Sequence, residues 1–345
     1  MNTKKLYKKL GKTPLIIAEV GQNHQGSLSL AKKYVKEFSK SGADIVKFQA
    51  RDNKTLFSKK AYNKNYDSES SFGKTYGEHR EKLELSFKEL KEIKKECEKK
   101  NLYFMITPFD EKSLKLVSRL NVDIIKIASF DLGNLPFINL IAKQKKIVAI
   151  STGGGNSKEI EESVRVLKKN KIKIILLHCV SEYPCPHDHL GLENINILKK
   201  KFPNCIIGIS DHFNGILSGP IAYLQGARVF EKHVTLNRAW KGTDHSFALE
   251  PEGFRRFVRD IHRSPEMLKS KNKKLIGKEP VFIKLGKSLI TTKNLKKGEK
   301  IKLENLSGKI FEKNLILVRY SHKIIGLTVK APIKKGDPIL LKFLK

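Results

Sequence analysis

Eight short apolar runs alternate with segments of helical periodicity along most of the chain. The runs occupy residues 15–20, 44–48, 102–107, 123–128, 146–151, 172–178, 205–210 and 227–234. Each run is nearly continuous in Val, Ile and Leu, which is typical of parallel strands buried on both faces. The alternation predicts an α/β fold of the (β/α)8 TIM-barrel type. An open doubly wound sheet is the alternative, because the sequence alone does not show closure.

The segments between the apolar runs carry helix signals. Residues 28–40 have one apolar face and stop before Gly42, a residue that commonly ends helices. Ser86 and Glu89 have the spacing of a capping box, and Ser157 opens another segment with an apolar face. We therefore expect a helix after most of the predicted strands.

The pattern changes towards the C-terminus, and three parts are predicted. Residues 1–263 form the TIM barrel, and the polar, Lys-rich residues 264–283 form a linker. Residues 284–345 contain short apolar runs with KKGE and KKGD turns at Gly298 and Gly336, which predicts a small β-rich domain. The stretches NLKKGEKIKLENL and PIKKGDPILLKFL indicate an internal half-repeat within it.

The formal net charge is +34, from 69 Lys and Arg against 35 Asp and Glu. Basic surfaces attract nucleic acids and anionic membranes without sequence specificity. Lysines occur in nearly every segment, however, and the chain has neither a basic stretch interleaved with aromatic residues nor a nucleic-acid-binding motif. We therefore expect no nucleic-acid partner and no membrane partner.

The sequence also bears on the compartment. No apolar run approaches the roughly 18 residues that span a bilayer, and the N-terminal residues have no apolar signal region. The cysteines Cys97, Cys179, Cys185 and Cys205 form no CxxC pair, which indicates reduced thiols. These features predict a soluble, cytoplasmic protein.

Polar side chains stand where most of the predicted strands end. The C-terminal ends of barrel strands carry the chemistry of such folds. The residues at these positions include Glu19, Lys47, Gln49, Thr107, Lys126, Ser129, Ser151, His178, Ser210, His212 and His233. Each is a weak signal alone, and His178 is interpreted as a hydrogen-bonded core histidine.

Taken together, the strand-end residues suggest a reaction class. Lys47 and Lys126 at separate strand ends can bind a small phosphorylated and carboxylated anion. His212 and His233 on neighbouring strands can hold a divalent metal in an open site, with structural imidazoles as the alternative. A metal beside an anion pocket suggests a Lewis acid that polarises a carbonyl while an anionic partner attacks it.

Five motifs carry a family resemblance. They are IAEVGQNHQGS (17–27), GKTYGEHREKLELS (73–86), ISDH (209–212), EKHVTLNRAWKGTDHSFALEP (231–251) and KLGKSLI (284–290). In this order they resemble the sialic acid synthase family, a TIM barrel followed by an antifreeze-like (SAF) domain, and they look closer to the animal-type enzymes than to the best-known bacterial branch. The resemblance implies condensation of phosphoenolpyruvate with N-acetylmannosamine or its 6-phosphate, assisted by Mn²⁺ or Mg²⁺. The products are N-acetylneuraminate or its 9-phosphate, plus phosphate.

The resemblance also implies residue roles. His212 and His233 would ligate the metal, and Glu19 and Asp244 are the expected catalytic residues, with Asp244 also contacting the sugar. The residues implied in substrate binding are Lys47, Gln49, Thr107, Lys126, Ser129, Asp131, Ser151, Ser181, Tyr183 and Ser210. The family arrangement further implies a domain-swapped homodimer in which the small domain closes the partner's barrel.

Three departures from the family pattern are visible. Phe130 follows KIAS where the family usually has a small residue, which suggests a reshaped pocket beside Asp131. Ser181 stands where the bacterial branch often has Asn. Near Ile310 the chain lacks the Arg that the bacterial branch inserts into the partner's sugar pocket, and Lys309 is a candidate substitute.

Two other functions stay open on the sequence. A related nonulosonic acid synthase would use the same chemistry on a 2,4-diacetamido hexose, as for legionaminic or pseudaminic acid. A degenerate barrel that binds polyanions is the non-enzymatic alternative, and it predicts steeply salt-dependent binding without turnover.

Overall fold

The computed structural model describes residues 3–270 and 275–345. Contacts divide the chain into two compact units, Met1–Leu268 and Lys269–Lys345. We call them the barrel unit and the C-terminal unit, and each is described by itself.

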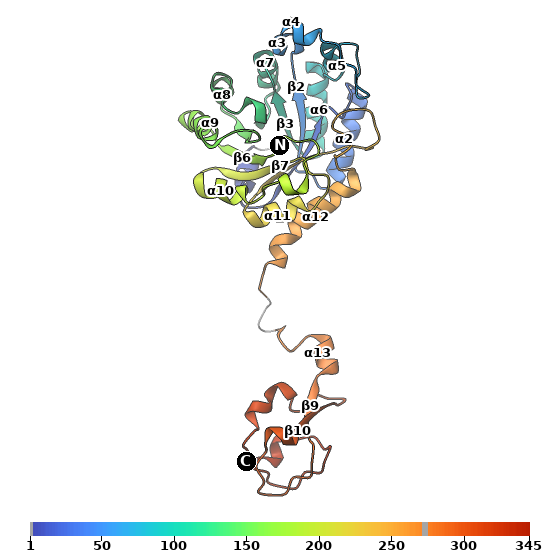
Figure 1. The fold of residues 1–345 in the computed structure, drawn as a ribbon, viewed down its shortest axis with the longest axis vertical. Coiled ribbons are helices and arrows are strands. Elements are labelled where there is room, and N and C mark those ends of the chain that lie inside the picture. Colours follow the sequence, from blue (N-terminus) through green and yellow to red (C-terminus); the bar gives the residue numbers. More distant parts are fainter. Residues whose placement is uncertain (1–2, 271–274) are drawn as a thin grey trace. The chain divides into compact units, whose positions relative to one another are not determined.

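The barrel unit is built on a closed parallel barrel (Figure 1). In chain order its strands are β1 (Leu15–Gly21), β2 (Ile45–Ala50), β3 (Tyr103–Pro108), β4 (Ile124–Ile127), β5 (Ile147–Ser151), β6 (Ile174–Cys179), β7 (Ile206–Asp211) and β8 (Val229–His233). Each strand pairs with the next, and β1 pairs with both β2 and β8. The predicted TIM barrel is therefore confirmed, and the open sheet is excluded.

Helices surround the strands (Figure 1). Those described in the barrel unit are α1 (Thr3–Lys9), α2 (Leu28–Lys40), α3 (Asn53–Leu56), α4 (Lys59–Tyr62), α5 (Tyr76–Lys82), α6 (Phe87–Lys99), α7 (Glu111–Leu120), α8 (Leu135–Ala142), α9 (Ser157–Lys169), α10 (Asn194–Lys201), α11 (Ser218–Gln225) and α12 (Pro251–Met267). The predicted capping box is confirmed, because Ser86 and Glu89 each accept a hydrogen bond from the other's backbone at the start of α6. Three short helices, α3 to α5, lie between β2 and α6 in the chain, and α5 contributes to the pocket described below.

The period of a strand decides which side chains reach the barrel interior, because successive side chains point to opposite faces. In β1, Ile16 packs in the core under the helices, whereas Ile17 packs in the core inside the barrel. Glu19 follows Ile17 with the same parity, so its carboxylate lies inside the barrel at the end of the strand. In β2, Lys47 follows Ile45 with the same parity, so its side chain also lies inside the barrel.

The end of the barrel unit differs from the predicted boundary. Helix α12 continues to Met267, and α13 covers Pro280–Leu285, so the predicted linker 264–283 is helical at both ends. The apolar face of α12 includes buried Ile261, and buried Ser264 extends it, which keeps the helix on the barrel despite its polar composition. Residues 271–274 of the predicted linker lie outside the described residues.

The C-terminal unit pairs β9 (Lys287–Thr291) with β10 (Leu306–Ile310) in an antiparallel ribbon. The two copies of the half-repeat meet where Leu295 and Ile333 exchange backbone hydrogen bonds of 2.8 and 3.0 Å. Gly298 and Gly336, in equivalent turns, have φ of 93° and 86°, a left-handed conformation that favours glycine. Short 3₁₀ segments at Leu303–Asn305 and Leu341–Phe343 follow the same repeat, and Val318–Lys323 forms a third.

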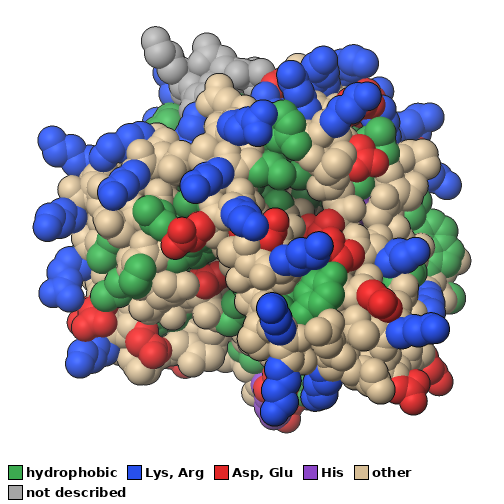
Figure 2. All heavy atoms as spheres, turned by 90° about the horizontal axis from the view of Figure 1, so that it is seen from above, with side chains coloured by type: hydrophobic (Ala, Val, Ile, Leu, Met, Phe, Trp, Pro, Cys, Tyr) green, Lys and Arg blue, Asp and Glu red, His purple; other side chains and the backbone are tan. Residues whose placement is uncertain are grey.

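The positive charge is distributed rather than gathered. Figure 2 shows Lys and Arg side chains spread across the face in view, with fewer Asp and Glu among them. In the part of the chain that the structure describes, no helix is long and apolar enough to cross a bilayer.

Gly208 in β7 allows close packing inside the barrel. A Cβ at this position would overlap the carbonyl oxygen of Val229 and come within 2.7 Å of Leu177 Cδ2. We expect Gly208→Ala to lower the free energy of unfolding by about 2 kcal/mol, measured by urea denaturation, because the strand backbones must shift. Gly253→Ala, in α12, is the matched control, since the atom nearest to its Cβ, Leu249 Cδ2, is 3.5 Å away. An equal loss in both variants would contradict the close-packing explanation.

Candidate active site

The C-terminal ends of the barrel strands surround a pocket of about 500 Å³. Twelve of the residues predicted from the sequence line it: Glu19, Lys47, Gln49, Thr107, Lys126, Ser129, Ser151, Tyr183, Ser210, His212, His233 and Asp244. His178 faces away from it, because its Nε2 lies 2.7 Å from the carbonyl oxygen of Leu190, as expected for a core histidine.

Two predicted residues, Asp131 and Ser181, are not among those that line the pocket. Asp131 ends a short 3₁₀ turn, and its Oδ1 accepts a hydrogen bond of 3.0 Å from Asn134 Nδ2. Ser181 is exposed beyond β6, with its hydroxyl against Gly153. Both therefore lie beside the pocket wall rather than on it.

Lys47 lines the pocket between two carboxylates. Its Nζ lies 2.8 Å from Glu19 Oε1 and 3.4 Å from Glu231 Oε1, and all three side chains are almost fully buried. Burial lowers the pKa of Lys47, but the two carboxylates outweigh it and raise the pKa, so the ammonium stays charged. Burial, assisted by the charge of Glu231, raises the pKa of Glu19 above that of an ordinary carboxyl group.

Lys126 is the second buried ammonium. Its Nζ donates a 3.1 Å hydrogen bond to the carbonyl oxygen of Ile127 and forms no ion pair within 4.0 Å among the described residues. Burial lowers its pKa, and the charge of Glu231 partly offsets this. An anionic ligand would supply the compensation that this buried cation lacks.

Several buried polar atoms of the pocket have no hydrogen-bond partner among the described residues. They are Glu19 Oε2, Arg80 Nε, Thr107 Oγ1, Ser151 Oγ, Glu231 Oε2 and His233 Nδ1. Buried polar groups are normally paired in folded proteins. A concentration of unpaired donors and acceptors in one pocket therefore indicates a polar ligand.

His212 and His233 lie side by side, with ring centroids 5.4 Å apart. His212 Nδ1 donates a hydrogen bond of 2.7 Å to the carbonyl oxygen of Val180, so Nε2 is the nitrogen of this ring that can bind a metal. Burial lowers the pKa of His233, which keeps its imidazole neutral. No group of three or more His, Cys, Asp and Glu that could hold a metal occurs in the described ranges. The donors fit an ion held by two imidazoles that completes its coordination with water and substrate.

The GQNHQGS motif positions Asp244. Asn23 Nδ2 donates hydrogen bonds to the carbonyl oxygens of Val234, at 2.9 Å, and Asp244, at 3.3 Å. Gly21 has φ of 57°, and a Cβ there would lie 3.2 Å from Gln49 Nε2 and 3.6 Å from an Asp244 oxygen. Glycine at this position thus lets the end of β1 approach both side chains.

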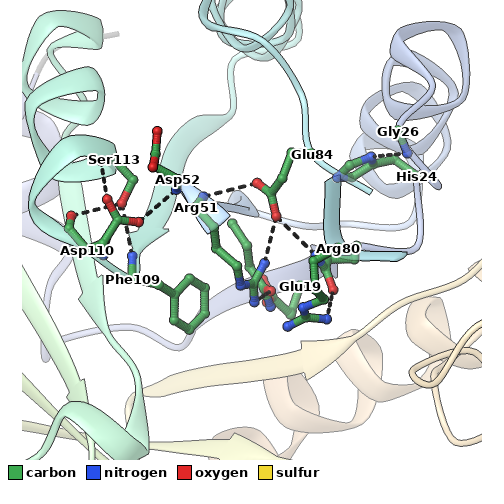
Figure 3. A network of polar contacts seen from close by, with 12 residues as sticks. Glu19, His24, Gly26, Arg51, Asp52, Arg80, Glu84, Phe109, Asp110 and Ser113 are labelled. Atoms are coloured by element: carbon green, nitrogen blue, oxygen red, sulfur yellow. Dashed lines mark hydrogen bonds and ion pairs between the residues drawn. The ribbon is translucent and has the colours of Figure 1, made fainter. Parts of the chain in front are cut away.

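A network of polar side chains extends the site beyond β2 (Figure 3). Arg51, Arg80 and Gln22 line the pocket, and Glu84 connects Arg51 with Gln22. Glu84 Oε1 accepts from Arg51 Nη1 and from Gln22 Nε2, both at 3.2 Å. Gln49 continues the network inward, because its Nε2 donates to Glu19 Oε1 at 2.8 Å.

Sequence reasoning did not assign Arg51, Arg80 or Glu231 to the site. The signals were present: Arg51 follows Lys47 and Gln49 at a spacing of two, and Glu231 precedes His233 at the same spacing. Arg80 lies within the motif GKTYGEHREKLELS (73–86), but strand periodicity cannot place α5 over the barrel, because this helix lies in an insertion after β2.

Phe130, the departure from the family pattern, forms part of the pocket wall. Its ring stacks on Phe109 with centroids 5.4 Å apart and an interplanar angle of 19°, and the ring of Phe109 lies 3.8 Å from Arg51 Cζ. Phe130 is therefore linked through Phe109 to Arg51, on the other side of the stack.

The chain is similar to proteins of known family. A profile of the NeuB family matches residues 34–273. The N-acetylneuraminate-9-phosphate synthase of Drosophila melanogaster is 34% identical, over 96% of this chain and 96% of that protein. The N,N'-diacetyllegionaminic acid synthase of Campylobacter jejuni is 38% identical, over 92% and 97%. A crystal structure of N-acetylneuraminic acid (sialic acid) synthetase from Leptospira borgpetersenii, in complex with citrate, matches with a TM-score of 0.68 and 32% identity, over 78% of this chain and 90% of that one.

Proposed function

The chain belongs to the NeuB family, and on that premise we propose that it condenses phosphoenolpyruvate with N-acetylmannosamine or its 6-phosphate. The products are N-acetylneuraminate or its 9-phosphate, together with inorganic phosphate. The observation that carries the proposal is the buried pocket in which Lys47 and Lys126 lie among unpaired polar atoms, beside two imidazoles.

Phosphoenolpyruvate fits the inner part of the pocket. Its phosphate and carboxylate supply the negative charge that buried Lys126 lacks. The hydroxyls of Thr107 and Ser151, buried without a hydrogen-bond partner in the described residues, are available to donate to it. Ser129, which follows β4, and Ser210, in β7, also line the pocket.

The sugar is proposed to lie beside the two histidines. The ring of Tyr183 lies against that of His212, with centroids 4.0 Å apart and an interplanar angle of 35°, and Asp244 Oδ2 is 3.7 Å from His233 Nδ1. Asp244 and Tyr183 can hydrogen-bond sugar hydroxyls from this position. A bound Mn²⁺ or Mg²⁺ on His212 and His233 would act as a Lewis acid towards the open-chain aldehyde.

Glu19 is placed to handle water. In the proposed reaction C3 of phosphoenolpyruvate bonds to the aldehyde carbon, water adds to the resulting cationic carbon, and phosphate leaves with C–O cleavage. Glu19 Oε1 is held by Lys47 and Gln49, so Oε2 is free to accept the proton of that water. The raised pKa of Glu19, caused mainly by burial, makes it a stronger base than an exposed carboxylate.

Glu19→Gln should lower kcat by about 100-fold with little change in the KM for phosphoenolpyruvate, because the amide keeps the shape but cannot accept a proton. Steady-state phosphate release measures both constants. Glu37→Gln, on the outer helix α2, is the control and should match the wild type. A Glu19→Gln enzyme with unchanged kcat would exclude Glu19 as the base.

A second synthase function has specific support from the 38% identity to the N,N'-diacetyllegionaminic acid synthase of Campylobacter jejuni. A 2,4-diacetamido hexose would then replace N-acetylmannosamine in the same chemistry. An assay of phosphate release from phosphoenolpyruvate separates the two synthase functions. It compares N-acetylmannosamine, its 6-phosphate and a 2,4-diacetamido hexose, each with and without Mn²⁺. The absence of turnover with all three sugars, combined with steeply salt-dependent DNA binding, would favour a degenerate polyanion-binding barrel.

We also propose a homodimer in which the C-terminal unit of one chain, as an antifreeze-like (SAF) domain, closes the pocket of its partner. Within the C-terminal unit, α13 exposes Val281, Ile283 and Leu285, each by more than half, and such an apolar surface usually marks an interface. Sedimentation equilibrium tests this, and a monomer with full activity would refute it. Free thiols at all four cysteines agree with a cytoplasmic location.

A further inference from the structure

The pocket contains a second pair of cations besides Lys47 and Lys126, namely Arg51 and Arg80. We propose that these two guanidinium groups form a second anion subsite, which binds the phosphate of a phosphorylated acylamino sugar. The inference rests on the proposed synthase function and deepens it, because it selects the 6-phosphate over the free sugar.

Arg51 is held in one orientation. Its guanidinium lies over the ring of Phe109, with Cζ 3.8 Å from the ring centroid, and its side chain is only 5% exposed. Nη1 donates to Glu84 Oε1 at 3.2 Å, and Nη2 donates to Gln49 Oε1 at 2.5 Å. A guanidinium fixed by stacking and by two hydrogen bonds loses little entropy when it binds an anion.

Arg80 has donors to spare. Nη1 donates to Gln22 Oε1 at 2.5 Å, whereas Nε is buried and has no hydrogen-bond partner in the described part of the chain. Its Cζ lies 5.6 Å from the ring centroid of Tyr76, which supports the side chain from α5. A buried guanidinium N–H without a partner is aimed at a ligand that the protein itself does not supply.

The charges around this pair favour an anion. The carboxylate of Glu84 accepts a hydrogen bond from Arg51. The carboxylate of Asp244 interacts electrostatically with both arginines. Burial, followed by the charge of Arg80, lowers the pKa of Arg51 to about 10, and a bound anion would offset both the lost hydration and the repulsion between the two guanidinium groups. Phosphate oxygens match the fork of donors on a guanidinium better than any neutral sugar hydroxyl does.

The position of the pair assigns the anion to the sugar rather than to phosphoenolpyruvate. The two lysines and the unpaired hydroxyls of Thr107 and Ser151 belong to the strands β2 to β5. Arg51 instead lies just before the inserted helices, and Arg80 lies in one of them, α5. A pocket of about 500 Å³ has room for both substrates.

The Phe130 ring supports this subsite indirectly. It stacks on Phe109, which in turn carries Arg51, so Phe130 is a positioning residue for the guanidinium. Phe130→Ala should therefore raise the KM for the sugar phosphate about threefold and leave kcat nearly unchanged. Phe130→Tyr, which keeps the stacked ring, should restore the KM.

The main test compares Arg80→Gln with the wild type, using N-acetylmannosamine and its 6-phosphate in the phosphate-release assay. We expect the wild type to prefer the 6-phosphate, and Arg80→Gln to raise its KM by at least about 10-fold with the KM for phosphoenolpyruvate unchanged. Arg119→Gln is the matched control, because Arg119 also rests on an aromatic ring, Phe87, but on the exposed helix α7.

Two results would overturn the subsite. One is a wild-type enzyme that prefers the free sugar, and the other is an Arg80→Gln defect that appears equally with both sugars or in the KM for phosphoenolpyruvate. Calorimetric binding of the sugar 6-phosphate separates the subsite from the synthase function. If the sugar 6-phosphate binds in a way that depends on Arg80 but no sugar is turned over, the synthase function is refuted and the subsite is retained. If a sugar is turned over but neither its binding nor its turnover depends on Arg80, the subsite is refuted and the synthase function is retained.

Discussion

His233→Ala is expected to reduce kcat/KM by at least about a thousandfold in the presence of Mn²⁺, because Lewis-acid polarisation of a carbonyl is worth several kcal/mol. His233 is buried at the end of β8, and it carries an imidazole nitrogen without a hydrogen-bond partner among the described residues. Its removal breaks no hydrogen bond within that part of the chain, so the fold should survive. His212→Ala should have a similar effect on activity, measured by phosphate release.

A matched variant and a binding measurement make this result specific. His262→Ala removes an exposed imidazole from α12 and should leave activity unchanged. Mn²⁺ should raise the melting temperature of the wild type but not of His233→Ala, because an ion that binds only the folded state stabilises it. A double variant without either histidine that keeps its activity in a chelator would show that the pair is structural.

The sequence was sufficient for the eight strands and for most of the strand-end residues of the pocket, because both follow from strand periodicity, whereas Tyr183 and Asp244 came from the family resemblance. Glu19 and Lys47 lie inside the barrel since they continue the parity of Ile17 and Ile45. Closure itself could not be read from the chain, because it depends on the pairing of β1 with β8, whose residues are more than 200 positions apart.

The parts of the site that escaped prediction do not follow from one strand at a time. Glu231 precedes His233 by two residues, which places both side chains on the same face of β8, but only the fold brings Lys47 to 3.4 Å from its carboxylate. Arg80 reaches the pocket from a short helix in the insertion after β2. Asp131 and Ser181 follow β4 and β6 but are not among the residues that line the pocket, since residues next to a strand end can face its neighbours rather than the cavity.

Lys47→Met should cause the largest combined loss, in both stability and substrate binding. The change leaves Glu19 and Glu231 buried without the cation that now lies 2.8 and 3.4 Å from them. Removal of one partner from a buried ion pair costs about 3–5 kcal/mol, so urea denaturation should show a loss of this size. The KM for phosphoenolpyruvate should also rise by at least about 100-fold, because an anion ligand is gone.

The loss of stability in Lys47→Met should depend on pH. Burial and the neighbouring Glu231 already raise the pKa of Glu19, and removal of the ammonium raises it further. A carboxyl group whose pKa is higher in the folded state than in the unfolded state favours folding only while protonated, so stability falls as pH rises above the ordinary glutamate value of 4.5. Unfolding measured at several pH values should therefore show a larger defect at neutral than at acidic pH.

Lys232→Met is the control that separates stability from chemistry. Lys232 forms an equally buried ion pair, 2.8 Å from Asp211 Oδ2, but it points outward from β8, where its Nζ lies 5.9 Å from the ring centroid of Phe257. It should lose a similar free energy of unfolding while its KM for phosphoenolpyruvate stays within about twofold of the wild type. If both variants raise that KM equally, the effect of Lys47 arises from damage to the barrel, and its assignment as an anion ligand is wrong.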